Sequence, residues 1–279
     1  MTVYEELQEL GIEFNEDKKE NDIEYLNYQT SWFLLKRNMR YFTTTIEDNR
    51  HAGLPSYSGI DFEQLRAISL VDFYISKIAT MYINTLENLI QVYLSRKYYE
   101  GHKEELDTIF FNYYSFKSNR DYGTIESFLT KSNFIDLIKM YNSLKANDKP
   151  VYYIPTTINV VRNKVYHNAP CFYDKVDCEF EELNNYLKND TLINEEAKLF
   201  MKHNYSDVSI YLYLVIYFSA AFLNASPALK YRKKNLFRES YLIQTALYQL
   251  DKVMYINEGA EDQIRILEVV LNNIKEDEE

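Results

Sequence analysis

Apolar residues recur at intervals of three and four positions along most of the chain, and this spacing predicts helices. The longest run begins after Asp61, where Gln64 at the third helical position completes the pattern of a capping box. It keeps one apolar face for about eight turns, and we expect it to end near Tyr99 and Gly101. The apolar positions of this face are Leu65, Ile68, Val71, Ile75, Ile78, Tyr82, Leu86, Leu89, Val92 and Tyr93.

The same spacing predicts shorter helices on both sides of the long one. Six glycines and five prolines in 279 residues leave few turns between them. We therefore expect an all-α chain, with an N-terminal helical elaboration at residues 1–60, a helical core at 61–225 and C-terminal helices at 226–279 packed on that core. The expected helices are 3–10, 18–42, 104–115, 124–146, 158–167, 177–188, 206–223, 236–256 and 260–275.

Hydropathy and cysteine usage indicate the compartment. The most apolar segment, Val208–Leu223, has 16 residues, fewer than the about 20 that a membrane span needs, so we expect a buried central helix. The first ten residues lack the basic segment and apolar core of a secretory signal. Cys171 and Cys178 are too few for a zinc site, and reduced thiols are typical of a cytoplasmic protein.

Charge limits the class of nucleic-acid partner. A formal net charge of −11 argues against a protein that coats nucleic acid without specificity, because such proteins neutralise many phosphates. Positive charge is nevertheless concentrated in one short segment. This basic cluster is either an exposed loop with a first helical turn or a contact surface for RNA; it comprises Lys230, Arg232, Lys233, Lys234 and Arg238.

Three groups suited to RNA chemistry stand within six residues of the helix expected at 158–167. The guanidinium of Arg162 stays charged at any relevant pH and can bind a phosphate through two hydrogen bonds. The imidazole of His167 can transfer a proton near neutral pH. Asn163 and His167 are four residues apart and share a helix face, whereas Arg162 must reach around the helix edge. Such a spacing also arises by chance on solvated helix faces.

The elements around this motif carry further expectations. Thr156 or Thr157 is placed to cap the helix, and Pro170 ends it. On the long helix, Glu87 lies beside the apolar face. If this carboxylate is buried it needs a partner, for which Arg162 is the candidate; otherwise it is an exposed glutamate.

Several segments together resemble abortive-infection (Abi-like) proteins, over roughly residues 5–170. The most distinctive match is the motif formed by Arg162, Asn163 and His167, which has the Arg-Asn-x-x-x-His signature of that family. An acidic motif on the preceding long helix is matched in part by Asn84–Ser95. The remaining matches are Leu10-Gly11-Ile12, Tyr25-Leu26-Asn27-Tyr28, Ser31-Trp32-Phe33, Phe62-Glu63-Gln64-Leu65 and Val71-Asp72-Phe73.

The resemblance implies a HEPN-like helical bundle and a HEPN ribonuclease that needs neither metal nor cofactor. In that family two subunits generally meet over one cleft, so a homodimer is expected. By this resemblance His167 acts as general acid or base, Arg162 stabilises the transition state and Asn163 orients the phosphate. Glu87 supports them. The expected RNA contacts are Lys164, Tyr166 and the basic cluster.

Three hypotheses follow. The first is a toxin-like endoribonuclease that acts in phage defence and leaves 2′,3′-cyclic phosphate ends. The second is a non-catalytic HEPN-like module that holds a small structured or regulatory RNA. The third is an interaction scaffold in which Arg162 and His167 are structural. Loss of cleavage in His167→Ala distinguishes the first from the others.

Overall fold

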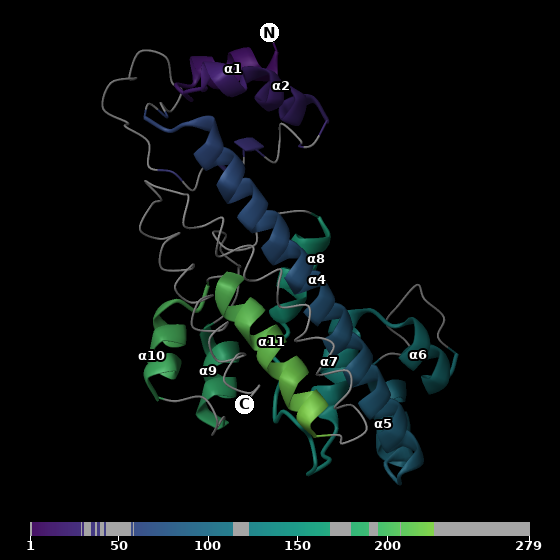
Figure 1. Ribbon diagram of the computed structural model, residues 1–279. Helices are drawn as coiled ribbons and strands as arrows, with labels where there is room; N and C mark the ends of the chain where they lie inside the picture. The colour runs from purple at the N-terminus through teal and green to yellow at the C-terminus, as the bar shows by residue number, and fades with distance from the viewer. Residues whose placement is uncertain are drawn as a thin grey trace. The chain divides into compact units, whose positions relative to one another are not determined.

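The computed structural model describes residues 2–28, 59–113, 123–167, 180–189, 195–206 and 208–225, together with residues 30, 35, 36, 38, 39, 42 and 57. These residues form helices and one isolated parallel β-bridge between Glu13 and Asp61, and none of them belongs to a strand (Figure 1). The chain is all-α, as the periodicity predicts. The helices expected at 236–256 and 260–275 lie outside the described residues, as does the basic cluster.

Ten α-helices and one 3₁₀ helix are described. Their bounds are α1 Val3–Glu9, η1 Glu16–Lys18, α2 Lys19–Tyr28, α4 Phe62–Tyr99, α5 Lys103–Tyr113, α6 Ile125–Lys131, α7 Phe134–Ser143, α8 Ile158–Tyr166, α9 Phe180–Asn189, α10 Glu195–His203 and α11 Val208–Asn224.

The long helix α4 begins and ends where its sequence predicts. Asp61 and Gln64 form the reciprocal capping box: the Gln64 amide donates to Asp61 Oδ1 at 2.8 Å, and the Asp61 amide donates to Gln64 Oε1 at 3.1 Å. After Tyr99, Gly101 adopts a φ of 115°, which a residue with a Cβ rarely tolerates. Of the ten apolar positions expected on the inner face, Val92 is the exception, with 49% exposure.

The described residues belong to two compact units, whose boundary falls after Ile78 in α4 and after Asn163 in α8. In the first unit, Phe14 stacks on Phe62 with ring centroids 4.8 Å apart, and Tyr25 meets Phe62 edge-on at 6.1 Å. These contacts join the start of α4 to α2 and to the segment before η1. The domain limits expected at residues 60 and 225 stay a prediction.

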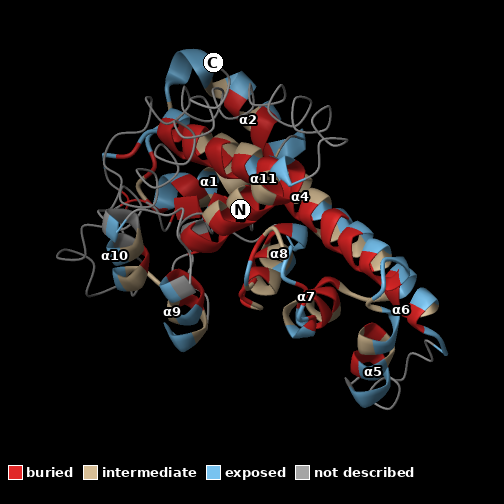
Figure 2. Ribbon diagram, turned by 90° about the horizontal axis from the view of Figure 1, so that it is seen from below, coloured by how far each residue is buried: buried red, intermediate tan, exposed pale blue. Residues whose placement is uncertain are grey.

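The second unit is built around α11, which is buried along most of its length (Figure 2). Ser219 on α11 donates its hydroxyl to the Tyr82 carbonyl of α4 at 3.2 Å. Phe222 packs edge-on against Tyr93 of α4, with ring centroids 6.0 Å apart, and lies tilted against Tyr141 of α7 at 5.5 Å. The expectation of a buried central helix at 206–223 is therefore confirmed, and none of the described helices combines the length and apolar character needed to cross a bilayer.

In this unit one sequence-based expectation is wrong, and one helix was not predicted. A single helix was expected over 124–146, but the helix is broken at Ser132, which is extended with ψ 152°. Asn133 then caps a new helix, because its side-chain oxygen accepts the backbone N–H of Asp136 at 3.1 Å. Helix α10 was not expected at all. Its acidic start at Glu195 and basic end at Lys202 and His203 suit the helix dipole and were a usable signal.

Candidate functional site

Helix α8 carries the Arg-Asn-x-x-x-His motif and turns its apolar side inward. Ile158, Val161 and Val165 are buried, at spacings of three and four residues. Arg162 next to this face is half-buried, and Asn163 is exposed. The helix is therefore fixed by its apolar face, while the motif side chains lie at the surface and its edge.

Arg162 has two neighbours in the second unit that matter for its orientation. One guanidinium nitrogen, Nη1, donates to Asn163 Oδ1 at 3.3 Å. The other neighbour is Glu87 of α4, which is close enough for the charge of Arg162 to act on its carboxyl group. Arg162 is thus hydrogen-bonded to the side-chain amide of the next residue, and its charge acts on a carboxyl group of α4.

Glu87 is half-buried, and both its burial and the charge of Arg162 act on the pKa of its carboxyl group. Burial raises the pKa of the Glu87 carboxyl, because desolvation disfavours the charged form, and the positive charge of Arg162 partly opposes that rise. Glu87 is half-buried, so neither of the two sequence-based expectations, a buried carboxylate or an exposed glutamate, holds in full, and its role beside Arg162 stays a prediction.

The turn that opens α8, formed by Thr156 and Thr157, is held by a carboxylate from another helix. Glu182 of α9 accepts hydrogen bonds from both hydroxyls, at 2.6 Å from Thr156 Oγ1 and 2.5 Å from Thr157 Oγ1. It also accepts the backbone N–H of Thr156 and, at 3.3 Å, that of Thr157. We call these four hydrogen bonds the Glu182 clamp. The threonines were expected to cap α8 with their own oxygens, but their hydroxyls donate to Glu182 instead.

Tyr153, three residues before this turn, joins the same carboxylate. Burial, the charge of Glu182 and a hydrogen bond to Glu182 all raise the pKa of the Tyr153 phenol. The approach to α8 and its first turn therefore share one acceptor.

The segment 144–157, which leads into α8, is tied down along its length. The Asn142 side chain exchanges two hydrogen bonds with the backbone of Ile154, one from Asn142 Nδ2 to the carbonyl at 2.8 Å and one from the Ile154 amide to Oδ1 at 3.0 Å. The Tyr141 hydroxyl contacts both the carbonyl and the amide of Val151. Glu105 of α5 accepts the Lys145 amide at 2.7 Å. A loop with so many partners presents α8 in one orientation.

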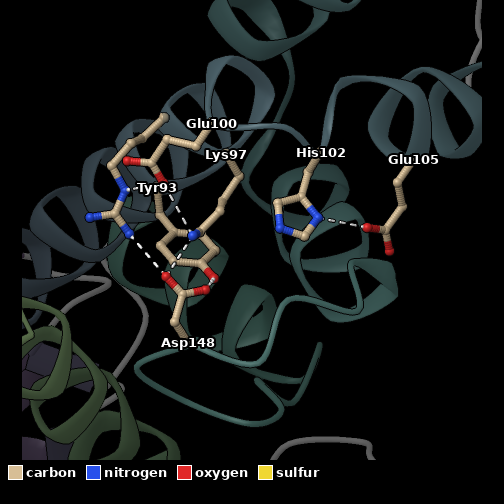
Figure 3. A network of polar contacts seen from close by, with 7 residues as sticks. Tyr93, Lys97, Glu100, His102, Glu105 and Asp148 are labelled. Atoms are coloured by element: carbon tan, nitrogen blue, oxygen red, sulfur yellow. Dashed lines mark hydrogen bonds and ion pairs between the residues drawn. The ribbon is translucent and has the colours of Figure 1, made fainter.

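Asp148 makes the most heavily charged of these attachments (Figure 3). Its Oδ2 lies 2.5 Å from Lys97 Nζ and 3.6 Å from Arg96 Nη2, and its Oδ1 accepts the Tyr93 hydroxyl at 3.2 Å. Glu100 is a second anion, 3.2 Å from Lys97 Nζ. The Asp148 network, comprising these five residues, joins the 144–157 segment to the C-terminal part of α4.

The other expected site residues lie in the first unit. Lys164 is half-buried, Tyr166 is 45% exposed, and His167, the residue directly after α8, is exposed. Among the described residues no group of three or more His, Cys, Asp or Glu side chains is arranged to hold a metal ion. The lysines and arginines of the basic cluster, 230–238, are outside the part of the chain that the structure describes.

Glu182 and Asp148 are site-shaping residues that the sequence did not single out. Lys97 had a usable signal, because it lies four residues after Tyr93 on the buried face of α4, where a charge needs a partner. Glu182 directly precedes the buried Leu183, so its position at the edge of the inner face of α9 could also have been predicted from the sequence.

Comparison of the chain with protein-family models, with curated proteins and with solved structures gives no match.

Proposed function

We propose that this protein is a metal-independent endoribonuclease of the HEPN type, acting in the cytoplasm as a toxin-like effector of phage defence. The observation that carries the proposal is the placement of Arg162. It lies half-buried at the surface, hydrogen-bonded to Asn163 and beside Glu87, on a helix fixed by the Glu182 clamp. An oriented guanidinium at a surface is suited to a phosphodiester.

The reaction needs only groups that this chain carries. The 2′-oxygen of the RNA attacks the adjacent phosphorus while the bond from phosphorus to the 5′-oxygen breaks, leaving a 2′,3′-cyclic phosphate and a 5′-hydroxyl. One imidazole takes the proton of the 2′-hydroxyl and another group gives a proton to the leaving oxygen. Arg162 stabilises the charge that develops on the phosphoryl oxygens, and Asn163 donates a hydrogen bond to one of them.

The proposed roles favour two copies of the chain. His167 follows α8 directly and is exposed, so it is accessible to a substrate. Each chain supplies one such motif, and the acid and base roles call for two proton-transferring groups. A homodimer in which two His167 side chains serve one RNA strand supplies both, and Lys164, Tyr166 and the basic cluster would extend the RNA contact.

The test compares wild type with His167→Ala and Arg162→Ala on a labelled RNA in EDTA. We expect the wild type to leave 2′,3′-cyclic phosphate ends, and each variant to lose at least about 100-fold in rate. His203→Ala is the matched control, because His203 is an exposed histidine on another described helix. Cleavage that persists in His167→Ala, or that stops in EDTA, contradicts the proposal. RNA that is bound by wild type and by His167→Ala but never cut identifies a non-catalytic RNA-binding module instead.

A further inference from the structure

The Glu182 clamp concentrates unusually many donors on one carboxylate. Two hydroxyls and two backbone N–H groups, from Thr156 and Thr157, all point at Glu182, and Tyr153 adds a phenol. Thr156 and Thr157 directly precede α8, and their carbonyls accept the amides of Asn159 and Val160 at 2.9 and 2.8 Å, so the acceptor that holds these two threonines also holds the start of the helix. A carboxylate also suits the positive end of the helix dipole.

We propose that Glu182 is a positioning residue, which fixes the first turn of α8 through Thr156 and Thr157 and thereby sets the direction in which α8 presents Arg162. This inference rests on the proposed function for its consequence in catalysis. The hydrogen bonds of the Glu182 clamp do not depend on that function.

Glu182 is suited to this role because α9 is itself held firmly. Leu183, Tyr186 and Leu187 on the next turn are buried, and Tyr186 packs edge-on against Phe218 of α11 with ring centroids 5.2 Å apart. The carboxylate therefore projects from a helix attached to the most buried element of the second unit. Through Glu182, α8 takes its orientation from α11.

Small movements of α8 matter at the distance of Arg162. Arg162 is the fifth residue after Thr157, which corresponds to about 7.5 Å along a helix. A tilt of about 10° over that length displaces the arginine by about 1.3 Å. Displacements of about 1 Å in a positioning group can lower a rate by about 100-fold. The neighbouring loop anchors do not replace the clamp, because they all contact residues before Thr156.

The first experiment measures kcat, KM and thermal stability for Glu182→Ala. We expect kcat to fall on the order of 10- to 100-fold at a temperature far below the unfolding midpoint, with KM nearly unchanged, because Glu182 acts through α8. Glu181→Ala, at the exposed neighbouring position, should keep the wild-type kcat. Leu129→Ala, at a buried position of α6, should lose stability through a cavity yet keep kcat, because it leaves both the clamp and the packing of α9 in place.

The second experiment does not depend on cleavage. Amide hydrogen exchange over residues 156–166 should quicken more in Glu182→Ala than in Leu129→Ala at equal overall stability. A wild type that cuts no RNA refutes the proposed function, and the exchange of α8 then still decides the inference. Unchanged exchange in Glu182→Ala overturns the inference, as does a kcat equal to that of wild type, or a loss of kcat in Leu129→Ala as large as that in Glu182→Ala.

Discussion

The Asp148 network should be essential for holding the segment that leads into α8, and Asp148→Asn tests this. The substitution keeps the size of the side chain and removes its charge. Lys97, whose side chain is only 8% exposed, then loses its nearest anion at 2.5 Å. It keeps Glu100 at 3.2 Å, so it is not left as an isolated buried charge.

The expected loss follows from that remaining partner. A buried charge stripped of all partners costs about 3–5 kcal/mol, whereas losing one hydrogen bond between charged groups costs about 1.5–3 kcal/mol. Because 54% of the Asp148 side chain is exposed, solvent screens the pair, and the lower part of the second range applies. We expect about 2 kcal/mol, or a fall of roughly 4–8 °C in the unfolding midpoint.

The pH dependence has a defined sign at both ends. The hydrogen bond from Lys97 holds the pKa of Asp148 below its usual 3.8, so this stabilisation is present above pH 3.8 and is lost as pH falls through the folded-state pKa. The hydrogen bond to Asp148 holds the pKa of Lys97 above its usual 10.5, so at the alkaline end it is lost as pH rises through that higher value. The difference between wild type and Asp148→Asn should therefore be constant from pH 5 to 9 and shrink near pH 3.

Urea unfolding at several pH values measures this difference, with Glu100→Gln as the matched control. Glu100 contacts the same lysine at 3.2 Å, against 2.5 Å for Asp148, and Asp148 also accepts the Tyr93 hydroxyl, so substitution of Glu100 should cost clearly less. The reasoning is refuted if Asp148→Asn changes the free energy of unfolding by under about 0.5 kcal/mol, the range of ordinary surface substitutions. It is also refuted if Glu100→Gln costs as much.

Two further predictions concern shifted pKa values. Burial lowers the pKa of Lys149, which lies 5.0 Å from the Tyr141 ring centroid, to about 8; in the protein with ¹³C-methylated lysines its resonance should titrate with that midpoint, and a midpoint near 10.5 would contradict it. Removing the guanidinium in Arg162→Leu should raise the pKa of Glu87 further, as followed by carboxyl NMR, because Arg162 opposes the rise that burial causes. Since a raised carboxyl pKa favours the protonated native state, the stability of that variant should fall more steeply than that of wild type as pH rises above about 4.5.

The elements that the sequence predicts well are those determined by neighbouring residues. The capping box at Asp61 and Gln64 spans four residues, and both of its hydrogen bonds form. The apolar faces of α4 and α11 follow from the spacing of apolar residues alone, because the residues on one face of a helix recur with the helical period. The break between α6 and α7 was missed because the apolar spacing on both sides continues across Asn133, whose capping role competes with that pattern.

Partners distant in sequence explain what the sequence did not predict about the site. Thr156 and Thr157 were recognised as polar residues at a helix start, but their acceptor is 25 and 26 residues away on a helix of its own. From their positions alone, Glu181 and Glu182 are both expected to be exposed acidic residues in the first turn of α9. Only the direction of the inner face, marked by Leu183, distinguishes them.

The order of these separations indicates when the candidate site can form. The exchange between Asn142 and Ile154 spans 12 residues, the Glu182 clamp spans 25 and 26, and the Tyr93 hydroxyl reaches Asp148 across 55. A helix of nine residues such as α8 is marginal in water by itself. Its orientation is therefore a property of the folded second unit, since α4, α7 and α9 must all be in place before Arg162 has a fixed direction. Substitutions far from the motif, at Asp148 or Glu182, should for that reason affect Arg162 as directly as changes within α8.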